Sequence, residues 1–200
     1  MAKSQYGRIP ARNLHHVAYR CRDAEQTRWF YEGVLGMPLV AALVREDGLE
    51  ECASKSPLMH LFFALDDGSF LAFFDDPGHA TEADFNIKHP FDLHIAFEVD
   101  DEAAVRERQA TLEKANVKTI FMDHGFLKSV YAFDPNGIEI EFTCRTSQYE
   151  ALLGQLNASL ESDMAAWKTM TSAIKAKRFT AENLGTGKPI PFRMPVLDPS

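Results

Sequence analysis

The sequence HHVAYRCRD at residues 15–23 returns in altered form as LHIAFEVDD at residues 93–101. When His16 is aligned with His94, both stretches read histidine, any residue, alanine and an aromatic residue, and both reach an aspartate seven residues after the histidine. Self-similarity of this kind predicts two copies of one structural unit. It leaves open whether the two histidines are matched core residues or two parts of one site.

The pattern of apolar residues around each copy predicts a strand, a helix and three further strands. The expected strands lie at residues 14–21, 37–43, 60–65 and 69–74, and again at 93–99, 117–122, 128–133 and 138–143. Asp23 is expected to cap the first helix and Asp100 or Asp101 the second, which we expect to end at Asn116. This order predicts an α+β fold of paired βαβββ modules, at residues 13–75 and 92–145, with residues 75–90 as the linker.

A turn that contains glycine joins the last two strands of each module, Asp66-Asp67-Gly68 in the first and Asp134-Pro135-Asn136-Gly137 in the second. Aligning Gly68 with Gly137 makes Phe62 the counterpart of Tyr131 and Ala72 the counterpart of Glu141. The repeat therefore holds at both ends of the modules.

Residues 148–200 form a different region. From Tyr149 onward, apolar residues recur at steps of three or four, which predicts an amphipathic helix. These residues are Leu153, Leu156, Leu160, Met164, Trp167, Met170 and Ile174. Glycines and prolines between 185 and 199 predict an extended arm after the helix. Because a long one-sided helix must bury its apolar stripe, we expect it to form a contact in a homodimer or higher homo-oligomer, or to cover the site.

The composition favours a globular protein and disfavours nucleic-acid and membrane partners. The chain is 46% apolar and 25% charged, which is typical of a globular protein, and its net charge of −8 offers no basic excess for nucleic acid or anionic membranes. We see neither an apolar run near the ~20 residues that span a bilayer nor the apolar core of a signal peptide. An odd count of three cysteines indicates reduced thiols. We therefore expect a cytoplasmic protein without nucleic-acid or membrane partners.

Two glutamates stand on one face of the last predicted strand. Glu139 and Glu141 alternate with Ile138, Ile140 and Phe142, so the carboxylates point away from the apolar core. A dry, unpaired carboxylate is costly, and we expect these two to meet water or a cation. Two histidines and a carboxylate suit non-haem Fe(II), and less selectively Mn(II) or Zn(II). The alternative is a pair of hydrogen-bonded core histidines beside a solvated strand face.

Residues 13–145 resemble the vicinal-oxygen-chelate superfamily, which includes glyoxalase I, extradiol ring-cleaving dioxygenases, fosfomycin-resistance enzymes and bleomycin-binding proteins. The stretches HHVAYRCRDAEQTRWFYEGVLGM, LHIAFEVDD and YAFDPNGIEIEF carry the resemblance. It implies paired βαβββ modules that curl a mixed sheet around a metal, with His16, His94 and Glu141 as ligands. The spacing typical of the superfamily selects His16 over His15, which is expected to point to the opposite face.

The resemblance is strongest to single-domain type I extradiol dioxygenases. Glyoxalase-type members carry a fourth ligand where this chain has Ala72, whereas extradiol enzymes use three. Tyr131, ten residues before Glu141, is typical of the extradiol branch. His60, two residues before the counterpart of Tyr131, is expected to act as acid–base, and His124 to contact substrate. The resemblance implies Fe(II), or Mn(II) or another divalent metal, and a small aromatic diol and O2 as substrates in aromatic catabolism.

Two other functions remain open at this point. A metal-dependent lyase, isomerase or epimerase on the same fold would use Zn, Ni or Co and consume no O2. A non-catalytic small-molecule-binding protein of the same fold would not need the three ligands.

Overall fold

The computed structural model describes residues 11–48, 56–87 and 89–179 of the chain. The chain divides into two compact units, one of residues 1–123 and 128–144 and the other of residues 124–127 and 145–200. The extended arm expected after residue 185 lies outside the described residues. Among the helices in the described part, none is both long and apolar enough to cross a membrane.

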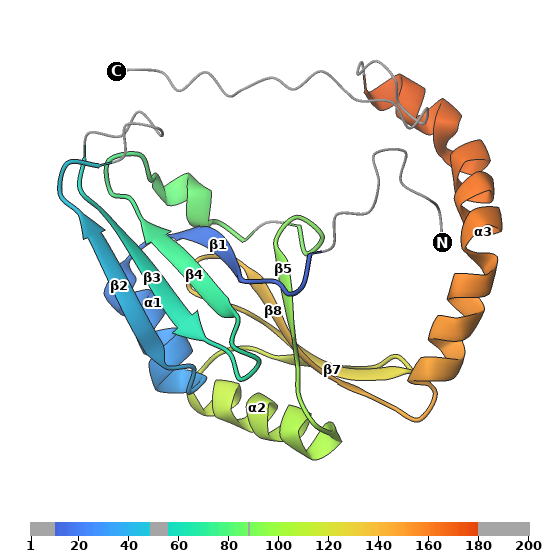
Figure 1. The fold of residues 1–200 in the computed structure, drawn as a ribbon, viewed down its shortest axis with the longest axis horizontal. Coiled ribbons are helices and arrows are strands. Elements are labelled where there is room, and N and C mark those ends of the chain that lie inside the picture. Colours follow the sequence, from blue (N-terminus) through green and yellow to red (C-terminus); the bar gives the residue numbers. More distant parts are fainter. Residues whose placement is uncertain (1–10, 49–55, 88, 180–200) are drawn as a thin grey trace. The chain divides into compact units, whose positions relative to one another are not determined.

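The two modules have the expected order of elements (Figure 1). The first module contains β1 (His16–Cys21), α1 (Ala24–Arg28), η1 (Trp29–Val34), β2 (Leu39–Arg45), β3 (Leu58–Ala64) and β4 (Phe70–Asp75). The second contains β5 (His94–Glu98), α2 (Glu102–Lys114), β6 (Ile120–Asp123), β7 (Leu127–Phe133) and β8 (Glu139–Arg145). The 3-10 helix η3 (Glu82–Phe85) lies in the linker, and α3 (Tyr149–Arg178) is the predicted amphipathic helix. The α+β prediction of paired βαβββ modules is confirmed.

Each module forms a four-stranded sheet of the same topology, β1-β4-β3-β2 in the first and β5-β8-β7-β6 in the second. The first strand of each module runs parallel to the last. His16 lies opposite Phe70 in one sheet, and His94 lies opposite Glu139 in the other. The repeat seen in the sequence is therefore a repeat of strand register.

The predicted caps begin and end the helices. The Asp23 carboxylate accepts a hydrogen bond from the Gln26 amide at 2.7 Å, and Asp101 rather than Asp100 does the same for Ala104 at 2.9 Å. Asn116 follows the end of α2 with φ of 61°, the left-handed conformation that ends helices. The two aspartates thus set where α1 and α2 begin, and Asn116 marks where the chain leaves α2 for the next strand.

One hydrophobic core joins the two modules. The core faces of the two sheets supply Leu61, Phe63, Leu71, Phe73, Phe97, Ile138, Ile140 and Phe142, and the helices supply Phe30, Tyr31, Val105 and Leu112. Ile138, Ile140 and Phe142 are at most 2% exposed, which confirms that alternate residues of β8 face the core. The glutamates between them therefore lie on the opposite face.

A buried polar cluster connects the first module to the β7–β8 turn. The Tyr31 hydroxyl donates to Asp134 at 2.9 Å, and the amides of Asn136 and Ile138 donate to the other oxygen of the same carboxylate at 2.8 Å each. The Asn136 side chain donates to Asp134 and Thr27. Burial raises the pKa of Asp134, and its hydrogen bonds to Ile138, Tyr31 and Asn136 oppose that rise. The cluster fixes the turn from which β8 begins.

The linker packs tightly against the same turn. Gly137 has φ of +77°, and a Cβ there would lie 2.7 Å from the carbonyl oxygen of Phe85 and 2.9 Å from that of Asn86. Gly68, its counterpart in the first module, has φ of +84° but open space around the same position. Both glycines therefore have a positive φ that favours glycine. Only at Gly137 would an added Cβ also clash with neighbouring backbone.

We predict that Gly137→Ala destabilises the protein more than Gly68→Ala. The Gly68 variant should lose only the ~1–2 kcal/mol that a left-handed residue costs, whereas the Gly137 variant adds a backbone clash for a total of ~2–5 kcal/mol. Urea unfolding followed by tryptophan fluorescence measures both. Equal losses would contradict the packing of η3 on the turn.

We further predict that Tyr31→Phe lowers the free energy of unfolding by ~1–3 kcal/mol, because it removes a buried donor to Asp134. Tyr19→Phe is the matched control: its ring also packs on Phe73, but its hydroxyl has no hydrogen bond within the described ranges. The control should change stability by less than ~0.5 kcal/mol. If the two variants unfold at the same urea concentration, the Tyr31–Asp134 bond contributes nothing.

Candidate metal centre

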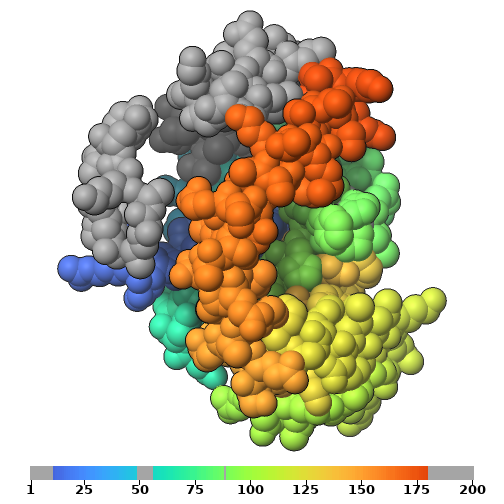
Figure 2. Space-filling model, turned by 90° about the vertical axis from the view of Figure 1, so that its right-hand side faces the viewer, coloured from blue at the N-terminus to red at the C-terminus, as the bar shows by residue number. Residues whose placement is uncertain are grey.

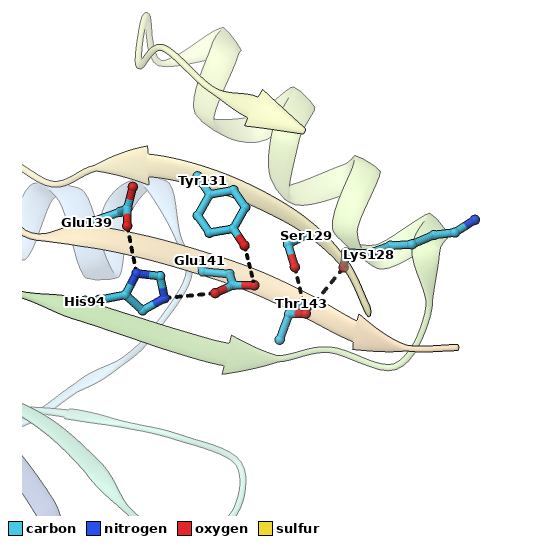
Figure 3. A network of polar contacts seen from close by, with 7 residues as sticks. All are labelled: His94, Lys128, Ser129, Tyr131, Glu139, Glu141 and Thr143. Atoms are coloured by element: carbon cyan, nitrogen blue, oxygen red, sulfur yellow. Dashed lines mark hydrogen bonds and ion pairs between the residues drawn. The ribbon is translucent and has the colours of Figure 1, made fainter. Parts of the chain in front are cut away.

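The centre of the candidate site is His94, which lies between two carboxylates (Figure 3). His94 pairs with Glu139 across the parallel strands β5 and β8, and Glu141 is two residues further along on the same face. Nδ1 of His94 lies 2.7 Å from Glu139 Oε2, and Nε2 lies 2.8 Å from Glu141 Oε2. One imidazole therefore contacts a carboxylate at each of its nitrogens.

The carboxylates are shielded from water, whereas the imidazole is partly open. The side chains of Glu139 and Glu141 are 13% and 10% exposed, and that of His94 is 34% exposed. Burial lowers the pKa of His94, but hydrogen bonds to Glu139 and Glu141 and the charges of both raise it, and the net pKa lies above the ordinary 6.5. An imidazolium ion that donates to both carboxylates partly neutralises them. A divalent cation bound by His94 Nε2 and Glu141 would also offset this negative charge.

Tyr131 completes the cluster from the neighbouring strand β7. Its hydroxyl donates to Glu141 Oε1 at 3.1 Å, so the two oxygens of Glu141 have different partners. Burial raises the pKa of Tyr131, a hydrogen bond with Ser129 opposes this rise, and the charge of Glu141 adds to it. The phenol therefore stays protonated at neutral pH and remains a hydrogen-bond donor.

A second polar contact follows along the same strands. Ser129 Oγ donates to Thr143 Oγ1 at 2.9 Å, and Figure 3 shows the Lys128 side chain pointing away from the cluster. The face of the second sheet that points away from the core is therefore polar along β7 and β8, with two carboxylates beside His94.

The same face of the first module has a different chemistry. His16, the counterpart of His94, lies with its ring centroid 6.1 Å from that of His60 and 5.8 Å from that of Phe62. Ala72 occupies the place that Glu141 has in the second module, since each pairs with an alanine two residues after the histidine. The first module thus contributes imidazole and aromatic rings but no carboxylate at these positions.

His60 lies on this face, near His16, and one of its ring nitrogens has no hydrogen-bond partner among the described residues. Its ring stacks on Phe74 with centroids 3.8 Å apart, and it lies 4.2 Å from Phe62. Its Nε2 is buried and has no hydrogen-bond partner in the part of the chain that the structure describes. Burial lowers the pKa of His60, and the nearby His16 lowers it further. The result is a neutral imidazole able to exchange a proton with a bound molecule.

The predicted ligands fit a divalent metal by their chemistry. His94 Nε2 and Glu141 Oε2 are adjacent nitrogen and oxygen donors, and His16 offers a second imidazole from the equivalent strand. Within the described ranges, no group of three or more His, Cys, Asp or Glu side chains is arranged to hold a metal ion. The joining of His16 to His94 and Glu141 at one ion stays a prediction.

His124 belongs to the second unit, whereas the other predicted site residues belong to the first. It lines a shallow cavity of about 440 Å³ together with Phe126, Ser147, Gln148, Ala151, Leu152 and Gln155. A substrate contact by His124 stays a prediction as well.

Two details of the site differ from what the sequence indicates. His15 was expected to point to the opposite face, but β1 begins only at His16, and Nδ1 of His15 lies 2.8 Å from Nδ1 of His16. Alternation does not apply before the strand starts, which explains the error. Glu139 was placed on the correct face but given no role of its own, although it contacts His94 directly. The parallel pairing of β5 with β8 is the signal that would have revealed that contact.

Comparison with known proteins assigns the family. The family model of the Glyoxalase/Bleomycin resistance protein/Dioxygenase superfamily matches residues 13–142. The chain belongs to this superfamily. The matched range agrees with the paired modules and ends before α3. No curated protein matches the chain.

Solved structures of superfamily members share the fold. A glyoxylase/bleomycin resistance protein/dioxygenase domain from Frankia sp. EAN1pec has a TM-score of 0.56 at 15% identity, covering 68% of this chain and 100% of that one. A glyoxalase/dioxygenase from Nostoc punctiforme has a TM-score of 0.51 at 24% identity, covering 70% of this chain and 99% of that one. At sequence identities this low, structural similarity establishes a shared fold but not a shared function. The superfamily includes glyoxalases and dioxygenases, and its members typically bind divalent metals.

We predict opposite pKa shifts for the two central histidines in metal-free protein. His94 should titrate above 6.5 and His60 below it. Stability contributed by His94 is then present below pH 6.5 and lost as the pH rises through its folded pKa. Stability contributed by neutral His60 is present above pH 6.5 and lost as the pH falls through its folded pKa.

NMR titration of the histidine ring protons after chelation of metals measures both values, with His94→Gln and His60→Gln assigning the signals. Glu139→Gln should lower the pKa of His94, because it removes one negative charge and leaves a neutral acceptor. Titration of both histidines on the same side of 6.5 would contradict the electrostatics described above.

Proposed function

We propose that the protein is a metal-dependent extradiol dioxygenase that cleaves the ring of a small aromatic diol. The observation that carries the proposal is the contrast between Glu141 and Ala72 at equivalent positions of the two sheets. One carboxylate and two histidines give three protein ligands, and a three-ligand centre leaves positions for two small molecules. A carboxylate in place of Ala72 would instead favour the four-ligand centre of glyoxalase-type members.

His16, His94 and Glu141 would hold the metal. Fe(II) suits this donor set best, and Mn(II) suits it as well. The bound ion would act as a Lewis acid and as a template for the diol and O2. Overall, one carbon–carbon bond beside the diol is broken, and both atoms of O2 enter the product.

The chain's own residues would position the diol and move its proton. His60 Nε2 has no hydrogen-bond partner among the described residues, and in the tautomer with the proton on Nδ1 it would accept a proton from one diol oxygen. The Tyr131 hydroxyl lies at Glu141 and would turn to donate to the other diol oxygen. The rings of Phe62 and Phe74 around His60 offer a flat apolar surface to an aromatic ring.

Glu139 would orient the ligand His94 rather than bind metal. It contacts Nδ1, so a proton held there leaves Nε2 free to coordinate. The compartment that fits this chemistry is the cytoplasm, since both cysteines in the described ranges, Cys21 and Cys144, are free buried thiols.

The proposal predicts oxygen uptake with catechols. Protein stripped of metal and reloaded anaerobically with Fe(II) or Mn(II) should consume O2 and form a yellow product from 2,3-dihydroxybiphenyl or another member of a catechol panel. His16→Ala, His94→Ala and Glu141→Gln should each weaken metal binding by more than ~100-fold. His60→Gln should keep the metal but lower turnover roughly 10²- to 10⁴-fold.

The control is His79→Gln, an exposed linker histidine beside Asp76, which should change neither metal content nor rate. Bound metal with no oxygen uptake across the panel would refute the dioxygenase and leave a lyase or isomerase. Failure to bind any divalent metal would refute the enzyme altogether.

A further inference from the structure

The helix α3 carries an apolar stripe that the described residues of its own unit leave exposed. It is one continuous helix of 30 residues, orange to red in Figures 1 and 2, and would extend ~45 Å. Leu153, Leu156, Leu160, Met164, Trp167, Met170 and Ile174 lie along one side and are between 48% and 68% exposed. Steps of three and four residues are those of helices that pair along their length. An apolar strip of this extent marks an interaction surface.

Two pairs of stripe residues lie symmetrically about the middle of the helix. The midpoint of α3 falls between Asp163 and Met164. Leu153 lies as far before that point as Ile174 lies after it, and Leu160 is matched in the same way by Trp167. A twofold axis through the midpoint would therefore place Leu153 of one copy against Ile174 of the other, and Leu160 against Trp167. A self-complementary patch of this kind is what a twofold homodimer requires.

The charges of α3 are separated along its length. Every charged residue in the first half is acidic: Glu150, Glu161 and Asp163. Every charged residue in the second half is basic: Lys168, Lys175, Lys177 and Arg178. A parallel pair of such helices would set like charges side by side, whereas an antiparallel pair sets opposite charges together. The acidic half of each helix would then lie beside the basic half of its partner.

We propose that α3 pairs antiparallel with α3 of a second copy of this chain, which buries both apolar stripes in a homodimer. Leu160 and Trp167 lie nearest the axis among the matched pairs and form the centre of the contact. Asp163 stands beside the axis and accepts a hydrogen bond from Ser159 at 2.6 Å. The two Asp163 carboxylates then approach each other, which weakens the pairing. This proposal is independent of the metal centre.

Sedimentation of the full chain tests the stripe. The protein should be a dimer at micromolar concentration, and Leu160→Glu or Trp167→Glu should raise the dissociation constant at least ~tenfold. Ala158→Glu places the same charge at an exposed position on the opposite side of α3 and should leave the dimer intact. Asp163→Asn should strengthen association. Circular dichroism confirms that each variant keeps its helix content.

Cross-linking tests the direction of the pair. In a Cys52→Ser background, oxidation of a Leu153→Cys and Ile174→Cys double variant should give covalent dimers, while Leu153→Cys alone should not. The two positions are ~30 Å apart in one helix, so they cannot join within a chain. Covalent dimers from Leu153→Cys alone would overturn the antiparallel arrangement. A monomeric native chain, or a dimer unaffected by Leu160→Glu, would overturn the interface.

Discussion

The carboxylate of Asp134 sets the position of the strand that carries the candidate ligand. It accepts hydrogen bonds from the Ile138 amide and from Tyr31 of the first module, so β8 starts at a defined residue and at a defined distance from that module. A shift of one residue would turn Glu141 into the core and Ile140 out of it. The site therefore depends on a buried hydrogen bond that lies outside it.

Although the two modules have the same topology, the residues around their equivalent histidines differ. Equivalent strands place His16 and His94 alike, yet the second sheet surrounds its histidine with Glu139 and Glu141, while the first surrounds it with His60 and Phe62. One face supplies charge and the other supplies apolar surface with a neutral imidazole. In the function proposed above, a planar diol would contact both kinds of surface.

Local patterns in the sequence were sufficient for most of the fold. Asp23, Asp101 and Asn116 act within a few residues of their helices, and the alternation of β8 depends on its neighbours alone, so these predictions are confirmed. Contacts between segments that are far apart in the sequence could not be predicted from local patterns. The contact of Glu139 with His94 arises from the register of β5 on β8, and the unsatisfied nitrogen of His60 arises from packing against Phe74. The orientation of His15 depended on where β1 begins, which alternation alone does not indicate.

The central claim is that one ion binds an imidazole from each module together with Glu141. X-ray absorption of the iron-loaded protein measures this directly, because imidazole rings give a characteristic outer-shell signal. The account predicts two imidazoles per iron in the native protein and one in either His16→Ala or His94→Ala at saturating metal. A spectrum that keeps both imidazoles when His16 is removed would contradict it.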